Sequence, residues 1–554
     1  MHPAAHDGQP ILIKFERYTM ALKPIPKAIV IAAAVGLLVF AGNWALNHYK
    51  SSSTGGGTST ASAATAIGNV FSSKKSDADL TVSLVSFHGY APALVANGGA
   101  LTTQPGSIYA NLGIKMNFIV QDDIPTLTTI FESGVAQCAW RTSDFWAQEQ
   151  PNLRNAKLDG RAVMVVDNTQ GGDAIISKDP NIRSVEDLAG KSVAMLQFTP
   201  SHGMTIDAIE NSSLSGKKKA SVKFVYINAD EGTAGVRAVL ESGKVDAVVL
   251  WDPDLALAIK NTGAHVVYST KQATNLIFDV MVCESRLLAT PDGQAKVQKF
   301  VTGWMQGVKA STANPSTAVD ALVNTEEMFK VLRQTEGDSF IKGLFSNVLW
   351  TGIEDNIRIL GLGGDTNHYE RVYKQFDQIY RVAGALANPN SPVINPSDSF
   401  DYRFIKSLMG TANGVAAAPT FSEAGRAQAK SASLTKPVYI NFESGSAELT
   451  QKAKKVVDTE MVPFIENNGA AYIEVGGNAD SVGSASSNRA LSFQRAQAVA
   501  SYLIKQWEIP ASRLKVVGNG SDKPICQEPG DADGLSLAEC RALNRTTRVG
   551  VLGR

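Results

Sequence analysis

The stretch AYIEVGGNADSVGSASSNRALSFQRAQAVASYLIKQW (471–507) decides the fold of the C-terminal region. Its first ten residues predict a strand that ends in a Gly-rich loop, and the segment from Leu491 to Trp507 predicts a long helix. Residues 447–468 have the pattern of an amphipathic helix. Further strand patterns occur in PVYINFE (437–443), RLKVVGNG (513–520) and TRVGVL (547–552). Residues 437–554 therefore predict a β-α-β-α-β domain of the α+β class.

The motif GGNADSVGSASSNRALSFQRAQAVASYL resembles the core of the OmpA-like peptidoglycan-binding domain. In that family a strand ends at an Asp, an Asn-x-x-Leu-Ser segment follows, and an Arg lies fifteen positions after the Asp. Asp480, Asn488, Leu491, Ser492 and Arg495 reproduce this spacing. The segments INFESGSAELT, RLKVVGNGSDKP and RALNRTTRV also correspond, so the resemblance covers 437–553. It implies a domain that binds peptidoglycan.

The expected ligand chemistry is a zwitterion. Diaminopimelate in a peptidoglycan stem carries an ammonium and a carboxylate on one carbon; Asp480 can accept from the first, and Arg495 can clamp the second. Asn488 and Arg545 are further candidates, either for ligand contact or for loop support. Taken singly, Asp480 also fits a turn residue and Arg495 a solvated helix face. Asn478 departs from the family, which often has His there, and this predicts different polar groups at the rim.

The central region alternates short β-rich runs with helical stretches, such as IKMNFIV (114–120), DAIISK (173–178), VDAVVLW (245–251) and FDVMVC (278–283). This alternation favours an α/β fold with largely parallel sheets covered by helices. After Pro291 the apolar periodicity becomes helical, as in Phe300, Trp304 and Val308. We expect a helical layer that closes two α/β lobes.

Three segments of this region resemble periplasmic substrate-binding proteins of the nitrate, sulfonate and taurine type: SFHGYAPALV (86–95), SVEDLAGKSVAMLQFTPSHGM (184–204) and DEGTAGVRAVLESGKVDAVVLWDPDLALA (230–258). DLAGK-x-V with the turn after it looks like the crossing into the second lobe, and GKVDAVVLWDPDL like an inter-lobe strand. The resemblance implies a two-lobed body with a ligand cleft.

The candidate solute residues lie in loops at strand ends, within 87–90, 141–143, 199–202 and 251–252. Backbone N–H groups at helix starts would hold a small anion, with hydroxyl, imidazole and guanidinium donors and aromatic walls around it. Each residue also has an ordinary interpretation: Ser201 as a helix N-cap, Trp251 as hinge packing, a histidine as a solvated loop residue. The candidates are His88, Tyr90, Arg141, Ser143, Thr199, Ser201, His202, Trp251 and Asp252.

Residues 28–46 (AIVIAAAVGLLVFAGNWAL) contain no charged side chain. At ~1.5 Å per residue, a helix of this length crosses a hydrocarbon layer of ~30 Å. Basic residues precede it, so the positive-inside rule predicts a cytoplasmic segment 1–27 and a periplasmic remainder. A cleaved secretory signal is the alternative, although the small residues 61–63 lie too far beyond the apolar stretch for the usual processing. We expect a bacterial inner-membrane protein with a single pass.

Cys526 and Cys540 lie in one loop-rich stretch, where an oxidising compartment favours a local disulfide. Cys138 and Cys283 each lie in an apolar, strand-like segment. Buried free thiols are slightly favoured for this second pair, and a bridge between them is the alternative. No Cys/His cluster has the spacing of a metal site, so we expect no structural metal.

Composition and motifs restrict the function. Lys plus Arg and Asp plus Glu number 52 each, a balance that provides no basic face for nucleic acid. The catalytic patterns G-x-S-x-G, Walker A and HExxH are all missing, which predicts a protein that is not an enzyme and has no cofactor.

Two Ser/Thr/Gly/Ala-rich stretches, 47–78 and 411–436, predict linkers on either side of a substrate-binding-like domain at 79–410. One interpretation is a periplasmic protein that binds peptidoglycan with 437–554 and a small anion with 79–410. The other is an envelope scaffold or stator-like anchor whose central domain docks an envelope protein partner.

Overall fold

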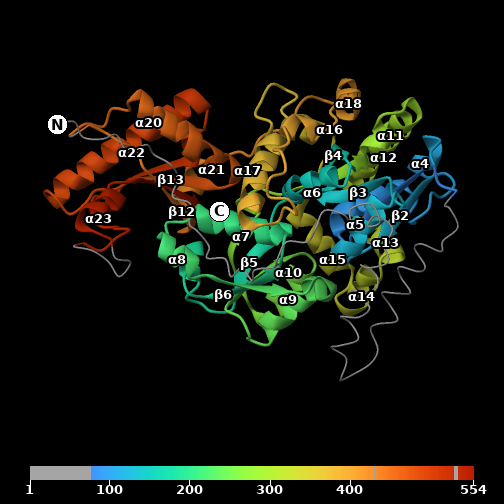
Figure 1. The fold of residues 1–554 in the computed structure, drawn as a ribbon, viewed down its shortest axis with the longest axis horizontal. Helices are drawn as coiled ribbons and strands as arrows, with labels where there is room; N and C mark the ends of the chain where they lie inside the picture. The colour runs from blue at the N-terminus through green and yellow to red at the C-terminus, as the bar shows by residue number, and fades with distance from the viewer. Residues whose placement is uncertain (1–76, 430, 444, 529–534, 554) are drawn as a thin grey trace, which may run out of the picture. The chain divides into compact units, whose positions relative to one another are not determined.

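The computed structural model describes residues 77–429, 431–443, 445–528 and 535–553 (Figure 1). The predicted cytoplasmic segment 1–27 and membrane anchor 28–46 lie outside the described residues. Within the described ranges, no helix combines the length and the apolar character that a bilayer crossing requires.

The first sheet of the central region has six strands in the order β11-β4-β10-β3-β1-β2. Strand β1 is parallel to β2 and β3, whereas β10 runs antiparallel to both β3 and β4, and β11 antiparallel to β4. All five residues of β1 are buried, as are those of β3. The strands are β1 (Leu80–Leu84), β2 (Met116–Val120), β3 (Cys138–Thr142), β4 (Gly160–Thr169), β10 (Phe278–Glu284) and β11 (Val348–Trp350).

The second sheet has five strands in the order β7-β6-β8-β5-β9. Strand β6 is parallel to β7 and β8, whereas β5 is antiparallel to β8 and β9. The strands are β5 (Asp173–Ser177), β6 (Ser192–Leu196), β7 (Lys223–Ile227), β8 (Ala247–Trp251) and β9 (His265–Ser269). The helices α7 (Pro200–Glu210), α8 (Gly216–Ala220), α9 (Gly232–Glu241) and α10 (Asp254–Thr262) belong to this lobe.

The α/β class and the two lobes are confirmed, but two details of the prediction are wrong. Each sheet is only partly parallel, because the strands next to the crossings, β5 and β10, run against their neighbours. The chain enters the second sheet between β4 and β5, over 170–172, and returns between β9 and β10. The segments 184–204 and 245–251, expected at the crossing, therefore lie wholly inside the second lobe.

Helices dominate after residue 290, as the periodicity predicted. Phe300, Trp304 and Val308 are buried on α12, which packs against α3 (Ala91–Ala96) of the first lobe. The helices of this layer are α12 (Pro291–Ala313), α13 (Pro315–Thr325), α14 (Glu327–Thr335), α15 (Asp338–Leu344), α16 (Ile353–Ile359), α17 (His368–Ala383) and α18 (Arg403–Lys406). The first lobe also contains α4 (Ile108–Asn111), α5 (Ile124–Glu132), α6 (Ser143–Asn155) and α11 (Ser285–Leu288).

Helix α17 contacts both lobes, through α6 of the first and α7 of the second. Tyr380 on α17 is fully buried, and its hydroxyl donates to the Thr199 carbonyl at 2.9 Å and to Asp144 Oδ2 at 3.3 Å. Gly203 on α7 allows this close packing, since a Cβ there would lie 2.6 Å from the Tyr380 hydroxyl. One helix therefore fastens the two lobes to each other.

The C-terminal sheet has the order β12-β15-β13-β14. Strand β13 (Tyr472–Gly477) is parallel to β14 (Leu514–Gly518) and antiparallel to β15 (Thr547–Leu552). The predicted helices are present as α20 (Gln451–Val456) with its continuation α21 (Val462–Asn467) and as α22 (Ala485–Trp507); a third helix, α23 (Leu537–Asn544), precedes β15. The predicted order of elements is observed, with α23 added and with the first strand at Ala432–Val438 rather than at the predicted 437–443.

The predicted linker 411–436 is wrong in its second half. Residues 432–436 belong to β12 (Ala432–Val438), which pairs with β15, and Leu434 is fully buried. Before it, α19 (Glu423–Gln428) places Arg426 so that its guanidinium donates to the Leu514 carbonyl at 3.1 Å. Small residues gave this stretch the composition of a linker, although Ser433, Leu434 and Val438 of β12 are buried in the domain.

Both cysteine pairs are bridged. Cys526 and Cys540 form the expected local disulfide, 14 residues apart in the sequence. Cys138 on β3 and Cys283 on β10 form a second disulfide, so the preference for free thiols at this pair is wrong. The physical reason is the register of β3 and β10, which makes these two residues direct cross-strand partners.

Candidate functional site

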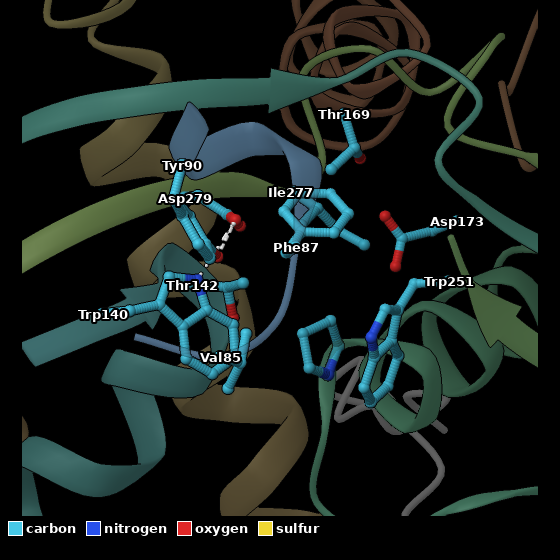
Figure 2. A pocket seen from close by; sticks show the side chains of 11 residues that line it. Val85, Phe87, Tyr90, Trp140, Thr142, Thr169, Asp173, Trp251, Ile277 and Asp279 are labelled. Atoms are coloured by element: carbon cyan, nitrogen blue, oxygen red, sulfur yellow. Dashed lines mark hydrogen bonds between the residues drawn. The ribbon is translucent and has the colours of Figure 1, made fainter. Parts of the chain in front are cut away.

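A cavity lies where the two sheets of the central region meet, with an empty volume of about 340 Å³ that is partly open to solvent. Both lobes contribute to its wall: the ends of β1, β3 and β4 and strand β10 from the first, and the start of β5, the start of α7 and the end of β8 from the second. Eleven residues line it (Figure 2): Val85, Phe87, Tyr90, Trp140, Thr142, Thr169, Asp173, Pro200, Trp251, Ile277 and Asp279.

On one side of the cavity, Asp279 is held by two aromatic donors. Its Oδ2 accepts from the Tyr90 hydroxyl at 2.5 Å and from Trp140 Nε1 at 3.1 Å. The register of β10 against β3 pairs Asp279 with Thr142, which explains why both side chains reach the same wall. Burial raises the pKa of Asp279 to about 7.

On the other side, Asp173 begins β5 and pairs across the ladder with Trp251 at the end of β8. Figure 2 shows its carboxylate turned toward the cavity, near the Trp251 indole. Asp173 is only 3 % exposed. Burial, followed by the charge of Asp279, raises the pKa of Asp173 well above its ordinary value, and the Thr169 hydroxyl opposes that shift.

A third carboxylate, Asp167 on β4, lies behind the lining. It is fully buried, and no donor reaches either of its oxygens. Burial and then the neighbouring charges of Asp279 and Asp173 raise the pKa of Asp167 well above its ordinary value. Because Asp167 and Asp279 carry like charges close together in a buried region, ionising one of them makes it harder to ionise the other.

Of the nine residues predicted for the solute, Tyr90 and Trp251 line the cavity. Three residues of the first lobe do not. His88 is fully buried beside Phe345, and burial lowers its pKa to about 3. Arg141 is fully buried in an ion pair with Glu149, and the Ser143 hydroxyl accepts from the Phe278 amide at 3.4 Å.

The remaining four predicted residues surround the start of α7 and the end of β8. The Thr199 hydroxyl donates to the Leu196 carbonyl at 2.8 Å, and Ser201 is fully buried. His202 Nδ1 accepts from the Phe198 amide at 3.2 Å, and burial lowers the pKa of His202 to about 4. Asp252 accepts from Asn347 at 2.7 Å and from the Ala256 amide at 3.1 Å, so it fixes the start of α10.

The cavity therefore takes wall residues from all four predicted loops, but from only two of the nine candidate side chains. Phe87, Thr142 and Pro200 line the cavity from within the predicted loops. Asp173 and Asp279 were not predicted. An Asp inside an apolar strand nevertheless indicates a functional position, because a buried carboxylate is costly unless a cation or hydrogen-bond donors accompany it. Within the described ranges, no group of three or more His, Cys, Asp or Glu is arranged to hold a metal ion.

In the C-terminal domain, three of the four predicted peptidoglycan residues are in direct contact. Asp480 Oδ2 forms an ion pair with Arg545 Nη1 at 2.5 Å, and Asp480 Oδ1 accepts from the Val482 amide at 3.1 Å. Asn488 Nδ2 donates to the carbonyls of Asp480, at 3.1 Å, and Val482, at 3.0 Å. The loop after β13 is thereby fastened to the start of α22.

Arg495 lies nearly three turns along α22, close enough to Arg545 for the two charges to interact. Its Nε donates to the Ser446 carbonyl at 3.0 Å, and its guanidinium lies 5.0 Å from the centre of the Phe442 ring. Burial and then the charge of Arg545 lower the pKa of Arg495. The close approach of α22 to β13 depends on Gly477, where a Cβ would lie 1.9 Å from the Ser492 carbonyl oxygen.

Two neighbours of this rim differ from expectation. Asn478 is buried, donates to the Thr546 carbonyl at 3.0 Å and accepts from Asn519 at 3.1 Å, so it is a structural residue rather than a rim group. Glu528, inside the Cys526–Cys540 loop, was not predicted; it accepts from the Ser481 amide at 3.1 Å and from Arg541 at 2.9 Å.

Comparisons with known proteins support both halves of this description. The OmpA family model matches residues 441–533, and the NMT1/THI5 like model matches residues 108–318. Outer membrane protein A of Shimwellia blattae is 30% identical over 139 residues, which are 24% of this chain and 56% of that protein. A putative aliphatic sulfonates-binding protein of Escherichia coli (strain K12) is 28% identical over 102 residues, 18% of this chain and 29% of that protein.

The chain thus spans about half the length of the first of these relatives and under a third of the second. Among solved structures, the periplasmic aliphatic sulphonate binding protein of Escherichia coli matches with a TM-score of 0.44 and 14% identity, over 58% of this chain and 96% of that one. By the two family models, the chain resembles NMT1/THI5 like proteins in its central region and the OmpA family in its C-terminal region.

Proposed function

We propose that this protein is a cell-wall-bound receptor for a small solute, tethered to the inner membrane by residues 28–46 and exposing the rest of the chain to the periplasm. The observation that carries the proposal is the cluster of Asp480, Asn488 and Arg545 with Arg495 at the same rim, in a domain of the OmpA family.

The geometry of this rim suits the zwitterionic end of diaminopimelate. Asp480 offers carboxylate oxygens to an ammonium, while Arg495 and Arg545 are both partly exposed and have further N–H groups for a carboxylate. A ligand with both charges gives the Asp480 carboxylate and the two guanidinium groups polar partners in place of the water that they lose on binding. This arrangement supports recognition of the peptide stem rather than of the uncharged sugar chain.

The central domain supplies the receptor half of the proposal. Its cavity takes wall residues from two lobes, which is the usual position of a ligand site between domains. The lining is mainly aromatic and apolar, with a small number of polar groups that could orient a bound molecule. We propose that this domain binds its solute without transforming it.

Co-sedimentation tests the wall-binding half. The purified full chain should pellet with diaminopimelate-type peptidoglycan and much less with lysine-type peptidoglycan, whose side chain has the ammonium but lacks the second carboxylate. Equal pelleting with both types would contradict recognition of the zwitterion, and no pelleting with either would contradict wall binding.

Cell fractionation tests the tether. The intact protein should remain in the membrane fraction, and a reporter fused after Ser52 should be active only if it works in the periplasm. A soluble mature form that begins near Ala61 would instead show that the apolar segment is a cleaved signal.

A further inference from the structure

The cavity of the central domain has an excess of buried acid. Asp173 and Asp279 line it and are each 3 % exposed, and Asp167 lies against Asp279 with no exposure at all. Among the eleven lining residues there is no Lys or Arg, and the groups that act most strongly on these three carboxylates are neutral or acidic. Taking such charges out of water is costly unless an opposite charge accompanies them.

The one guanidinium that the sequence suggested for this site is engaged elsewhere. Arg141 donates to Glu149 through Nη2 at 2.8 Å and to the Trp140 carbonyl at 2.6 Å, and it lies between the rings of Phe131 and Phe145. It is therefore part of the packing between β3 and α6. An anion entering the cavity would meet carboxylates and aromatic faces without this positive partner.

Aromatic rings form the rest of the wall. Phe87, Tyr90, Trp140 and Trp251 all line the cavity, and Figure 2 shows them around the same space as the two carboxylates. The faces of aromatic rings carry negative potential and attract cations, Trp most strongly. Rings and carboxylates together form a surface complementary to a positively charged group with an apolar outline.

We infer that the cavity takes a small organic cation, an ammonium head group with apolar substituents, rather than the anion expected from the sequence. In this arrangement the carboxylate of Asp173, which points into the cavity, forms the ion pair with the ligand. Asp279 stays hydrogen-bonded to Tyr90 and Trp140 and adds its charge from the opposite wall. The inference rests on the proposed solute-binding function of this domain and specifies its ligand class.

Calorimetric titration of the full chain tests the inference with three probes. Choline is the cation, 3,3-dimethyl-1-butanol is its uncharged counterpart of nearly the same shape, and ethanesulfonate is the anion. Choline should bind and the other two should bind at least about ten-fold more weakly. Asp173→Asn, which keeps the shape of the side chain, should weaken choline binding by roughly 30-fold or more. Asp230→Asn, an exposed position, is the matched control and should bind normally.

The direction of the pH dependence separates the two charge classes. A cation binds the ionised carboxylates, so choline affinity should rise between pH 5.5 and 8. The groups whose charges or hydrogen bonds act most strongly on Asp173 and Asp279 include Tyr90, Trp140, Thr169, Asp144, Asp167 and Asp252, and none of these supplies a positive charge. Affinity that falls with rising pH would indicate an anion held by protonated carboxyls, and would overturn the inference.

The remaining outcomes are equally decisive. Tight ethanesulfonate binding that survives Asp173→Asn would overturn the cation and leave the receptor function intact. Equal affinity for choline and 3,3-dimethyl-1-butanol would show that shape alone matters and would also overturn it. If none of the three probes binds while the chain still pellets with peptidoglycan, the cation is rejected, and the scaffold alternative gains over the receptor.

Discussion

Asp480 and Arg545 form an ion pair of 2.5 Å between the loop after β13 and the end of α23. The Asp480 side chain is 11 % exposed and that of Arg545 49 %, so the carboxylate is set back while part of the guanidinium faces solvent. The sequence suggested Asp480 and Arg495 as the two halves of the site. In the structure, Arg545 is a third member of this site, because its guanidinium orients the Asp480 carboxylate.

Peptidoglycan binding should depend on all three of these charges. We expect Asp480→Ala and Arg495→Ala each to weaken pelleting by roughly 30-fold or more, because each leaves an unpaired, partly buried charge. Arg545→Lys keeps the charge and loses the planar fork, so it should fall between wild type and Arg545→Ala. Lys505→Ala, exposed on α22, is the control. If both alanine variants pellet like wild type, the domain has the fold but does not bind peptidoglycan through these residues.

The two disulfides should contribute unequally to stability. On the chain-entropy model, closing the 14-residue separation of Cys526 and Cys540 contributes roughly 3 kcal/mol, and closing the 145-residue separation of Cys138 and Cys283 roughly 5 kcal/mol. Paired Cys→Ser variants compared by urea unfolding measure both, and mass spectrometry without reductant should show both links. Thiols that are freely alkylated in the native protein would contradict the corresponding bridge.

The acid of the cavity predicts how stability changes with pH. Burial raises the pKa of Asp279 to about 7, against about 4 in an unfolded chain. Between these values the folded state binds more protons than the unfolded state, so the free energy of unfolding falls as pH rises through that window. Asp279→Asn removes the titration, and its unfolding midpoint should fall less than that of wild type between pH 5 and 8. Asp230→Asn should follow wild type.

Tyr380→Phe tests the connection between the lobes. Loss of the hydroxyl leaves the Thr199 carbonyl and Asp144 without this donor, which should lower the free energy of unfolding by about 1 kcal/mol. Tyr439→Phe is the matched control, since that side chain is half exposed. Equal unfolding midpoints for the two variants would show that the buried hydroxyl contributes nothing.

Local sequence patterns predicted most of the elements, and the failures have physical reasons. Periodicity located α12 and α22, and the motif spacing placed Asn488 where its side chain donates to the Asp480 carbonyl. The bridge between Cys138 and Cys283 depends on which strands are neighbours, and strand order cannot be read from a single segment.

The cavity shows the same limit. Asp173 and Asp279 occupy strand positions and reach the cavity only because β5 pairs with β8 and β10 pairs with β3. Arg141 was expected to contact a ligand, but its guanidinium forms an ion pair with Glu149 on α6. The positions of the two carboxylates and of Arg141 depend on contacts between segments that are distant in the sequence. The loops could be recognised from their local sequence alone.

The fastening of both lobes by α17 has a consequence for the timing of solute exchange. Moving the lobes apart requires α17 to lose its packing against α6 or α7, including a hydrogen bond of Tyr380 to Asp144 or Thr199, so any exchange that needs such opening is slowed by the free energy of that separation. Arrival and departure are slowed together, which leaves the equilibrium affinity unchanged. A receptor of this kind would report the solute level averaged over its own residence time and would ignore brief fluctuations.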